Sequence, residues 1–332
     1  MKISIVGLIP IALACLVSTR VVPANSIPDA EVMANVENES YQVTESGLST
    51  NEVTATVEVY NHRTGKTMTL SMCEYLQGVV RGEMSGEYPM EALKAQAIAA
   101  RTYVYYLKDA GKRHPGGACV CTNHDCCQAW AAVDKSWKYY DKIKCAVEET
   151  EGIVITYEGK PILAMYFSSS GGYTENYTDV WGDKPCVYLQ SVPSKNEQAY
   201  SFFDTVFVQE FHNWTVLSEL RSAGYPIRCD SAQLLNSIEN IVRSDTGRVI
   251  SMEIDGVTIS GTAVRECLGL RSTHFYFQDN PNGGINIITV GFGHGVGMSQ
   301  CGAAAMAEEG CDYTDILHHY YTDVELEWMA FR

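Results

Sequence analysis

Residues 71–84 have the sequence SMCEYLQGVVRGEM. Ser71 and Glu74 have the spacing of a capping box, in which two side chains satisfy backbone N–H groups at a helix N-terminus. Beyond them, apolar residues recur at helical spacing and share one face with a single acid. The residues of this face are Leu76, Val79, Val80 and Glu83. The stretch therefore predicts a helix whose apolar face ends in a carboxyl group.

The sequence on both sides of this helix predicts strands as well as helices. Apolar and polar residues alternate over 53–59, and Met68 and Leu70 follow a turn, as in a hairpin. A second helix should begin at Pro89 and place Arg101 on its flank. Farther along, we expect hairpins at 153–166 and 249–260, a strand at 285–290, and helices at 208–223, 231–241, 299–309 and 313–321. This mixture predicts the α+β class, with mixed sheets and packed helices.

The composition is that of a globular and acidic chain. Its 332 residues are 46% hydrophobic, enough for one large or two modest domains with a core. The 24 Lys and Arg residues against 40 Asp and Glu residues give a formal net charge of -16. Because binding to nucleic-acid phosphates needs clustered positive charge, we expect no nucleic-acid partner.

Residues 1–24 have the features of an export signal. Lys2 precedes a nearly uncharged run over 3–19, and Val22-Pro23-Ala24 is a candidate cleavage site. The length of the run fits either a cleaved signal peptide or a membrane anchor. We therefore expect an extracytoplasmic protein, secreted or anchored at the cell membrane, with a polar linker over 25–52.

Four of the twelve cysteines fall within nine positions, between Cys119 and Cys127. Together with two nearby histidines they offer more donors than the four that tetrahedral zinc requires. The six candidates are His114, Cys119, Cys121, His124, Cys126 and Cys127. Local disulfides or free thiols are the alternative interpretation.

Glu83 is the residue best suited to acid chemistry. A carboxyl at the end of an apolar stripe is partly desolvated, which raises its pKa toward the range that a general acid needs. Alternatively, the helix end exposes Glu83 to solvent, or Arg81 or Arg101 forms an ion pair with it.

Two loops rich in small residues could contact a ligand. Residues 168–172, Ser-Ser-Ser-Gly-Gly, follow an apolar strand. Glycines alternate over 291–297, and in an extended segment they would leave one flat face that a sugar ring could approach. Alternatively, these glycines supply positive φ angles in a tight loop, and His294 between them is a hydrogen-bonded core residue.

Several longer motifs carry a resemblance to a known family. They cover 75–84, 88–103, 159–162, 170–176, 179–182, 269–273 and 293–300. Together they resemble the stage II sporulation protein D family (SpoIID, with its relative LytB), over roughly 53–325. The resemblance implies a SpoIID/LytB catalytic domain over that range, with mixed sheets and helices around a glycan-binding cleft.

The resemblance also implies a function. It is that of a peptidoglycan lytic transglycosylase, which acts during engulfment in sporulation on glycan strands already denuded of stem peptides by a partner amidase. The Gly-Glu-Met motif of the family assigns catalysis to Glu83, whose single carboxyl acts first as acid and then as base, leaving 1,6-anhydro-muramyl ends. The expected substrate contacts are Ser169, Ser170, Tyr173, His294, Met298 and Gln300.

A structural zinc ion is implied as well, with His114, Cys121, Cys126 and Cys127 at the aligned positions. The sequence departs from the family pattern here, because Cys126 replaces a histidine and the spacing from His114 is one residue longer. Cys119 or His124 are therefore alternative ligands. Phe167 also replaces a usual histidine before the serines. These departures permit a second function, that of a non-catalytic glycan-binding enhancer of an N-acetylmuramoyl-L-alanine amidase.

Overall fold

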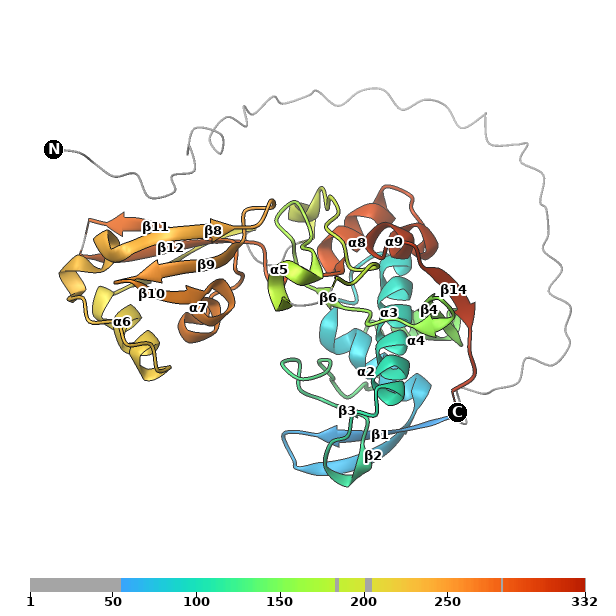
Figure 1. Ribbon diagram of the computed structural model, residues 1–332. Coiled ribbons are helices and arrows are strands. Elements are labelled where there is room, and N and C mark those ends of the chain that lie inside the picture. Colours follow the sequence, from blue (N-terminus) through green and yellow to red (C-terminus); the bar gives the residue numbers. More distant parts are fainter. Residues whose placement is uncertain (1–54, 183–184, 201–204, 282, 332) are drawn as a thin grey trace, which may run out of the picture. The chain divides into compact units, whose positions relative to one another are not determined.

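The computed structural model describes residues 55–182, 185–200, 205–281 and 283–331. The predicted signal segment over 1–24 and linker over 25–52 lie outside these residues. Residues 51–332 form one compact unit. In the described residues, helices combine with several small sheets of two or three strands, which confirms the predicted α+β class (Figure 1).

The described residues begin with the predicted hairpin and the predicted capped helix. β1 (Thr56–Asn61) pairs antiparallel with β2 (Lys66–Ser71), and β3 (Val120–Cys121) joins β1 in parallel. α2 (Met72–Glu83) follows β2 directly, with Ser71 and Glu74 forming the capping box. Its apolar face is fully buried, so burial holds Glu83 at the end of a fixed helix.

α3 (Met90–Asp109) lies in the middle of the first core, the buried apolar residues contributed by 57–189 and 296–324. α2, α4 (Tyr140–Glu148), α8 (Gln300–Glu308) and α9 (Tyr313–Tyr320) contact it. The prediction that Arg101 lies on the flank of this helix is wrong, because its side chain is fully buried. Its guanidinium donates to the carbonyls of Val147 and Ile153, both at 3.2 Å, which satisfies the buried charge with backbone dipoles.

Short strands complete the first core. β4 (Ile153–Tyr157) lies between β14 (Glu325–Trp328) and β5 (Lys160–Pro161). The predicted hairpin over 153–166 is therefore only partly correct, since its last residues leave the sheet. They form β6 (Tyr166–Phe167), which pairs in parallel with β13 (Met298–Ser299). α5 (Tyr177–Trp181) and short 3-10 turns at Pro115–Gly117 and Glu197–Ala199 lie in the connections.

A second core, made of buried apolar residues of 216–287, fills the segment drawn in yellow to orange in Figure 1. β12 (Gly284–Val290) lies between β11 (Phe275–Asn280) and β7 (Val206–Phe211), and β9 (Val249–Ile254) lies between β10 (Val257–Ser260) and β8 (Ile238–Arg243). α6 (Asn213–Ser222), α7 (Gly261–Leu268) and a 3-10 helix (Ser231–Ser237) cover them. Of the helix predicted over 208–223, residues 213–222 are helical and 208–211 belong to β7. Of the helix predicted over 231–241, residues 231–237 form a 3-10 helix and 238–241 belong to β8.

Within the described residues, no helix combines the length and the apolar character needed to cross a membrane.

Candidate functional site

A cavity of about 1040 Å³ contains Glu83 in its wall. The cavity is lined by residues of α2, β6 and α7 and of two loops. The loops are the cysteine-rich loop over 114–129 and the glycine loop over 291–297. Of the predicted substrate contacts, His294 and Gln300 lie in this wall. Phe167 lies there too, in the position where a histidine is usual in the resembling family.

The Glu83 carboxyl accepts two N–H hydrogen bonds and has a hydroxyl close by. The backbone N–H of Ala129 donates to Oε1 at 2.6 Å, the Tyr166 hydroxyl lies 3.5 Å from the same oxygen, and Gln300 Nε2 donates to Oε2 at 3.5 Å. Burial is the largest influence and raises the pKa of Glu83, while the bonds from Ala129 and Gln300 lower it in part. The net effect is a raised pKa, as the sequence predicts. Such a carboxyl can hold its proton closer to neutral pH and give it to a bound ligand.

His294 is a fixed part of the cavity wall. Its Nε2 donates to the carbonyl of Tyr166 at 3.0 Å, and its Nδ1 accepts from the N–H of Val296 at 3.1 Å. Burial lowers the pKa of His294 to about 3, so the ring stays neutral. Because both nitrogens are engaged, this imidazole has no free position for proton transfer.

Aromatic rings extend the wall on either side of His294. The Trp181 ring lies 5.2 Å from it and the Phe167 ring 5.5 Å, between centroids. Trp181 is 40% exposed, so part of its face is open to a ligand. A broad aromatic face of this kind suits the apolar face of a sugar ring.

The glycines of the loop over 291–297 have the positive φ angles of a tight loop, which was the alternative interpretation of their pattern. Gly291, Gly293, Gly295 and Gly297 all have φ between +74° and +111°, which excludes the extended segment with one flat face. The loop is tight, and its first two side chains line the cavity while the next two enter the core. Phe292 and His294 line the cavity, whereas Val296 and Met298 are fully buried.

The structure places the predicted contacts Ser169 and Ser170 around Glu197. Both hydroxyls donate to this buried carboxylate at 2.8 Å. The N–H groups of Ser170 and Gly171 and the hydroxyls of Ser194 and Ser299 donate to it as well, at 2.5–3.1 Å. The serine turn is thereby joined to the N-terminus of α8. Tyr173 is 55% exposed and, like Ser169, Ser170 and Met298, is not among the residues that line the cavity.

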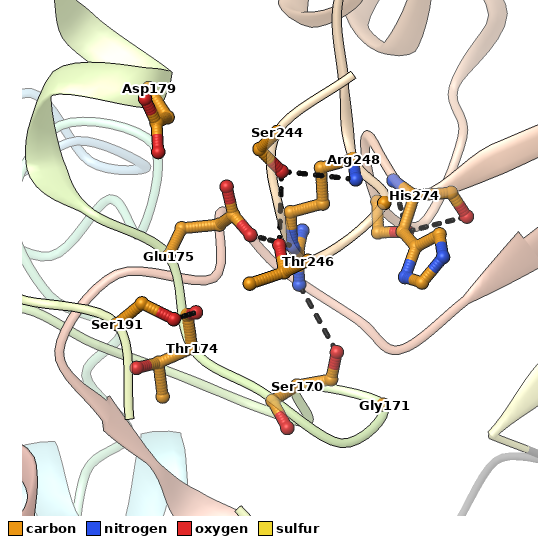
Figure 2. Close-up of polar contacts among 12 residues, drawn as sticks. Ser170, Gly171, Thr174, Glu175, Asp179, Ser191, Ser244, Thr246, Arg248 and His274 are labelled. Atoms are coloured by element: carbon orange, nitrogen blue, oxygen red, sulfur yellow. Dashed lines mark hydrogen bonds and ion pairs between the residues drawn. The ribbon is translucent and has the colours of Figure 1, made fainter. Parts of the chain in front are cut away.

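Arg248, from the second core, supports two loops of the first. Its Nη1 donates to the carbonyl of Gly293 at 3.2 Å and its Nη2 to that of Ser170 at 3.3 Å. Its Nε lies 3.8 Å from Oε1 of Glu175, and both side chains are almost completely buried (Figure 2). Burial raises the pKa of Glu175 to about 7, against the opposing charge of Arg248. This buried pair fixes the backbone on which His294 is carried.

The four residues that the resemblance gives as zinc ligands come together. The donor atoms of His114, Cys121, Cys126 and Cys127 all lie within 4.8 Å of one another. One imidazole and three thiols are a donor set that suits tetrahedral zinc. The alternatives lie outside this group: Cys119 is buried in the first core, and exposed His124 contacts Asp125 at 3.3 Å. The described cysteines are all free thiols, so the local disulfides of the alternative interpretation are not formed.

The cysteine-rich loop reaches Glu83 directly. Cys126 and Cys127 line the cavity, and Ala129, two residues farther along, donates to Glu83. Gln128 accepts from the Tyr166 hydroxyl at 2.7 Å. Whatever holds the four donors together therefore also orients the groups around the Glu83 carboxyl.

Sequence reasoning did not single out Glu197, Trp181 or Arg248. Trp181 lies within one of the motifs that carry the resemblance, so its place in the wall had a sequence signal. Glu197 and Arg248 lie outside all of them, and most of their partners are far away in the sequence.

Comparison with known proteins places the chain among its relatives. The family model described as SpoIID, Stage II sporulation protein, matches residues 60–157. The chain is 37% identical to Stage II sporulation protein D of Bacillus amyloliquefaciens, over 83% of this chain and 79% of that protein. It is 33% identical to the Bacillus subtilis protein of the same name, over 89% and 87%. An amidase enhancer of Bacillus subtilis is 26% identical over 76% of this chain and 40% of its own length. With α2 and Glu83 inside the region that the family model matches, and with these relatives covered over most of their length, the chain belongs to the SpoIID family.

Proposed function

We propose that this protein is a peptidoglycan lytic transglycosylase of sporulation, with Glu83 as its catalytic residue. Membership of the SpoIID family supports a role in cell-wall processing during sporulation. The observation that carries the finer proposal is the Glu83 carboxyl, which has a raised pKa and lies in a large cavity beside an aromatic wall.

In the proposed reaction, protonated Glu83 gives its proton to the oxygen of the glycosidic bond that follows a muramic acid. The bond from that oxygen to C1 breaks. The Glu83 carboxylate then takes the proton of the sugar's own 6-hydroxyl, whose oxygen bonds to C1 and closes a 1,6-anhydro ring. Glu83 ends protonated, and no water is consumed. The N–H of Ala129 and the amide of Gln300 stabilise the carboxylate between the two proton transfers.

We further propose that His114, Cys121, Cys126 and Cys127 hold a structural zinc ion. Bound zinc would supply a rigid tether between these four side chains and no step of the reaction. The loop that carries them would then hold Ala129 and Gln128 in place beside Glu83.

The proposed substrate is a glycan strand whose stem peptides an amidase has removed. The amidase enhancer among the relatives supports a partner of this kind. The site of action would be outside the cytoplasm, with the protein secreted or attached to the membrane through the N-terminal segment. That proposal rests on the sequence of residues 1–24 alone.

Mass spectrometry of denuded strands tests the reaction. Strands incubated with the wild-type protein should acquire 1,6-anhydro ends, and Glu83→Gln should abolish them. Glu327→Gln, which changes an exposed acid on β14, is the matched control and should leave the products unchanged. Ordinary reducing ends would indicate hydrolysis, for which Asp125 and Glu266 in the same wall would be candidates. Strand binding without any product would leave the amidase enhancer function instead.

A further inference from the structure

The cavity of Glu83 also contains an arginine that lacks a carboxylate partner. Arg265, in the last turn of α7, lines the cavity wall. Its Nε donates to the carbonyl of Leu270 at 3.3 Å, which fixes the direction of the side chain. In the described part of the chain, no carboxylate forms an ion pair with Arg265, and its two terminal nitrogens donate to no protein group. In a chain with a net charge of -16, such an arginine is conspicuous.

The charges around Arg265 keep it cationic without neutralising it. Burial lowers its pKa, whereas the charges of Glu266 and Asp125 raise it. An arginine stays protonated throughout the range in which proteins are folded. Its charge in turn lowers the pKa of His294, which lines the same cavity.

Asp125 and Glu266 limit which ligands Arg265 can bind. They line the same cavity, so the wall as a whole does not attract anions. An anionic ligand can overcome this repulsion only by direct contact with the guanidinium. Recognition at this point therefore depends on a carboxylate held in bonding geometry, which the planar pair of terminal nitrogens provides.

We propose that Arg265 binds the lactyl carboxylate of a muramic acid in the strand. This inference rests on the proposed function and names the group that the site recognises. Removal of a stem peptide breaks the amide bond at the lactyl group and leaves one free carboxylate on that muramic acid. A strand that still carries its peptides has a neutral, substituted amide at the same place. Arg265 thus distinguishes denuded strands from intact ones.

The experiment compares two forms of one strand. Fluorescently labelled denuded strands are used as they are, or after their lactyl carboxylates have been converted to neutral methylamides. Binding to the full chain is measured by fluorescence anisotropy in a Glu83→Gln background, which is expected to leave the strands uncut. This background should bind the carboxylate form more tightly. Addition of Arg265→Gln should weaken that binding by about 10- to 100-fold, as for loss of charge-assisted hydrogen bonds, and leave the methylamide form unaffected.

Two further variants separate recognition from charge and from folding. Arg228→Gln removes the same charge from an exposed position outside the cavity and should change neither affinity. Arg265→Lys keeps the charge but loses the planar pair of donors, so it should retain part of the preference for the carboxylate form.

The proposal is overturned if the Glu83→Gln background binds both forms equally. Equal weakening of both forms by Arg265→Gln would also overturn it, since Arg265 would then only shape the wall through Leu270. The two hypotheses fail separately. A wild-type protein that prefers the carboxylate form but yields no anhydro ends would refute the transglycosylase and leave the role of Arg265 standing.

Discussion

Replacement of Glu197 by glutamine should strongly destabilise the fold. Six donors converge on the Glu197 carboxylate, three on each oxygen. In Glu197→Gln an NH₂ group that cannot accept replaces one oxygen, so about three bonds to a charged acceptor are lost. The other three become bonds to a neutral amide. Because removal of one partner from a buried charged network costs about 3–5 kcal/mol, the free energy of unfolding should fall by at least about that amount.

Urea unfolding followed by tryptophan fluorescence measures this change. With a dependence on urea of about 3 kcal/mol per molar, the midpoint should fall by about 1 M or more. The control Glu327→Gln alters an exposed acid and should stay within about 0.5 kcal/mol of wild type. A loss of less than about 1 kcal/mol in Glu197→Gln would refute the argument that this carboxylate joins the serine turn to α8.

Three further predictions concern the site. Because the folded chain holds the proton of Glu83 to higher pH than the unfolded chain does, kcat/KM should fall as the pH rises through the raised pKa. The free energy of unfolding should fall as the pH rises from the ordinary pKa of a glutamate to the raised pKa of Glu83, and Glu83→Gln should remove this pH dependence. Urea unfolding from pH 4 to 8 measures it, and the same pH dependence in wild type and Glu83→Gln would contradict the assignment. Zinc analysis of the purified chain should find one ion, and His114→Ala or a chelator should lower both the melting temperature and the activity. His318→Ala, which changes an exposed side chain of α9, should lower neither, and a zinc-free chain of full activity would exclude the ion. Trp181→Ala should weaken strand binding by about 2- to 12-fold, as for the loss of one aromatic stacking contact, and unchanged anisotropy would remove this ring from the binding surface.

Local signals in the sequence were sufficient for α2 and the first hairpin. The capping box at Ser71 and Glu74 and the stripe that follows depend only on residues within one helix. The hairpin at Asp255 and Gly256 was equally local, because both residues adopt the positive φ that its turn requires. Such elements can be predicted since their stabilising contacts are close in sequence.

β7 shows what could not be predicted in this way. Alternate residues of β7, Val206 and Val208, are exposed, while Phe207 and Phe211 are partly buried. With apolar residues on both faces, the segment has no clear period of two, and its pairing with β12 sets its conformation. Tertiary contact outweighed local preference here.

In the candidate site, too, some residues could be predicted from local sequence and others depend on tertiary contacts. Glu83 follows from the helix pattern and the family motif, and the set of four metal-ligand candidates follows from the family resemblance. The structure gives the Glu83 carboxyl a buried environment and gathers the donor atoms. Arg101 was misplaced because a helical wheel treats arginine as a surface residue, whereas carbonyls of distant segments satisfy it in the core. The convergence of Ser169, Ser170 and Ser299 on Glu197 depends on three separate loops, and no periodic pattern in the sequence indicates it.

The glycine loop over 291–297 has a consequence for how this wall can diversify. At Gly293 an added Cβ would lie 2.8 Å from Cβ of Phe167, and at Gly295 it would lie 2.6 Å from the guanidinium carbon of Arg248. Every second position is thus closed to any side chain, by both backbone angle and space. The intervening positions 292 and 294 face the cavity and carry no such restriction on φ. New ligand preferences in this family member should therefore arise by substitution of Phe292 and His294 while the backbone stays the same. These two positions are the ones in the loop at which redesign can change the cavity wall.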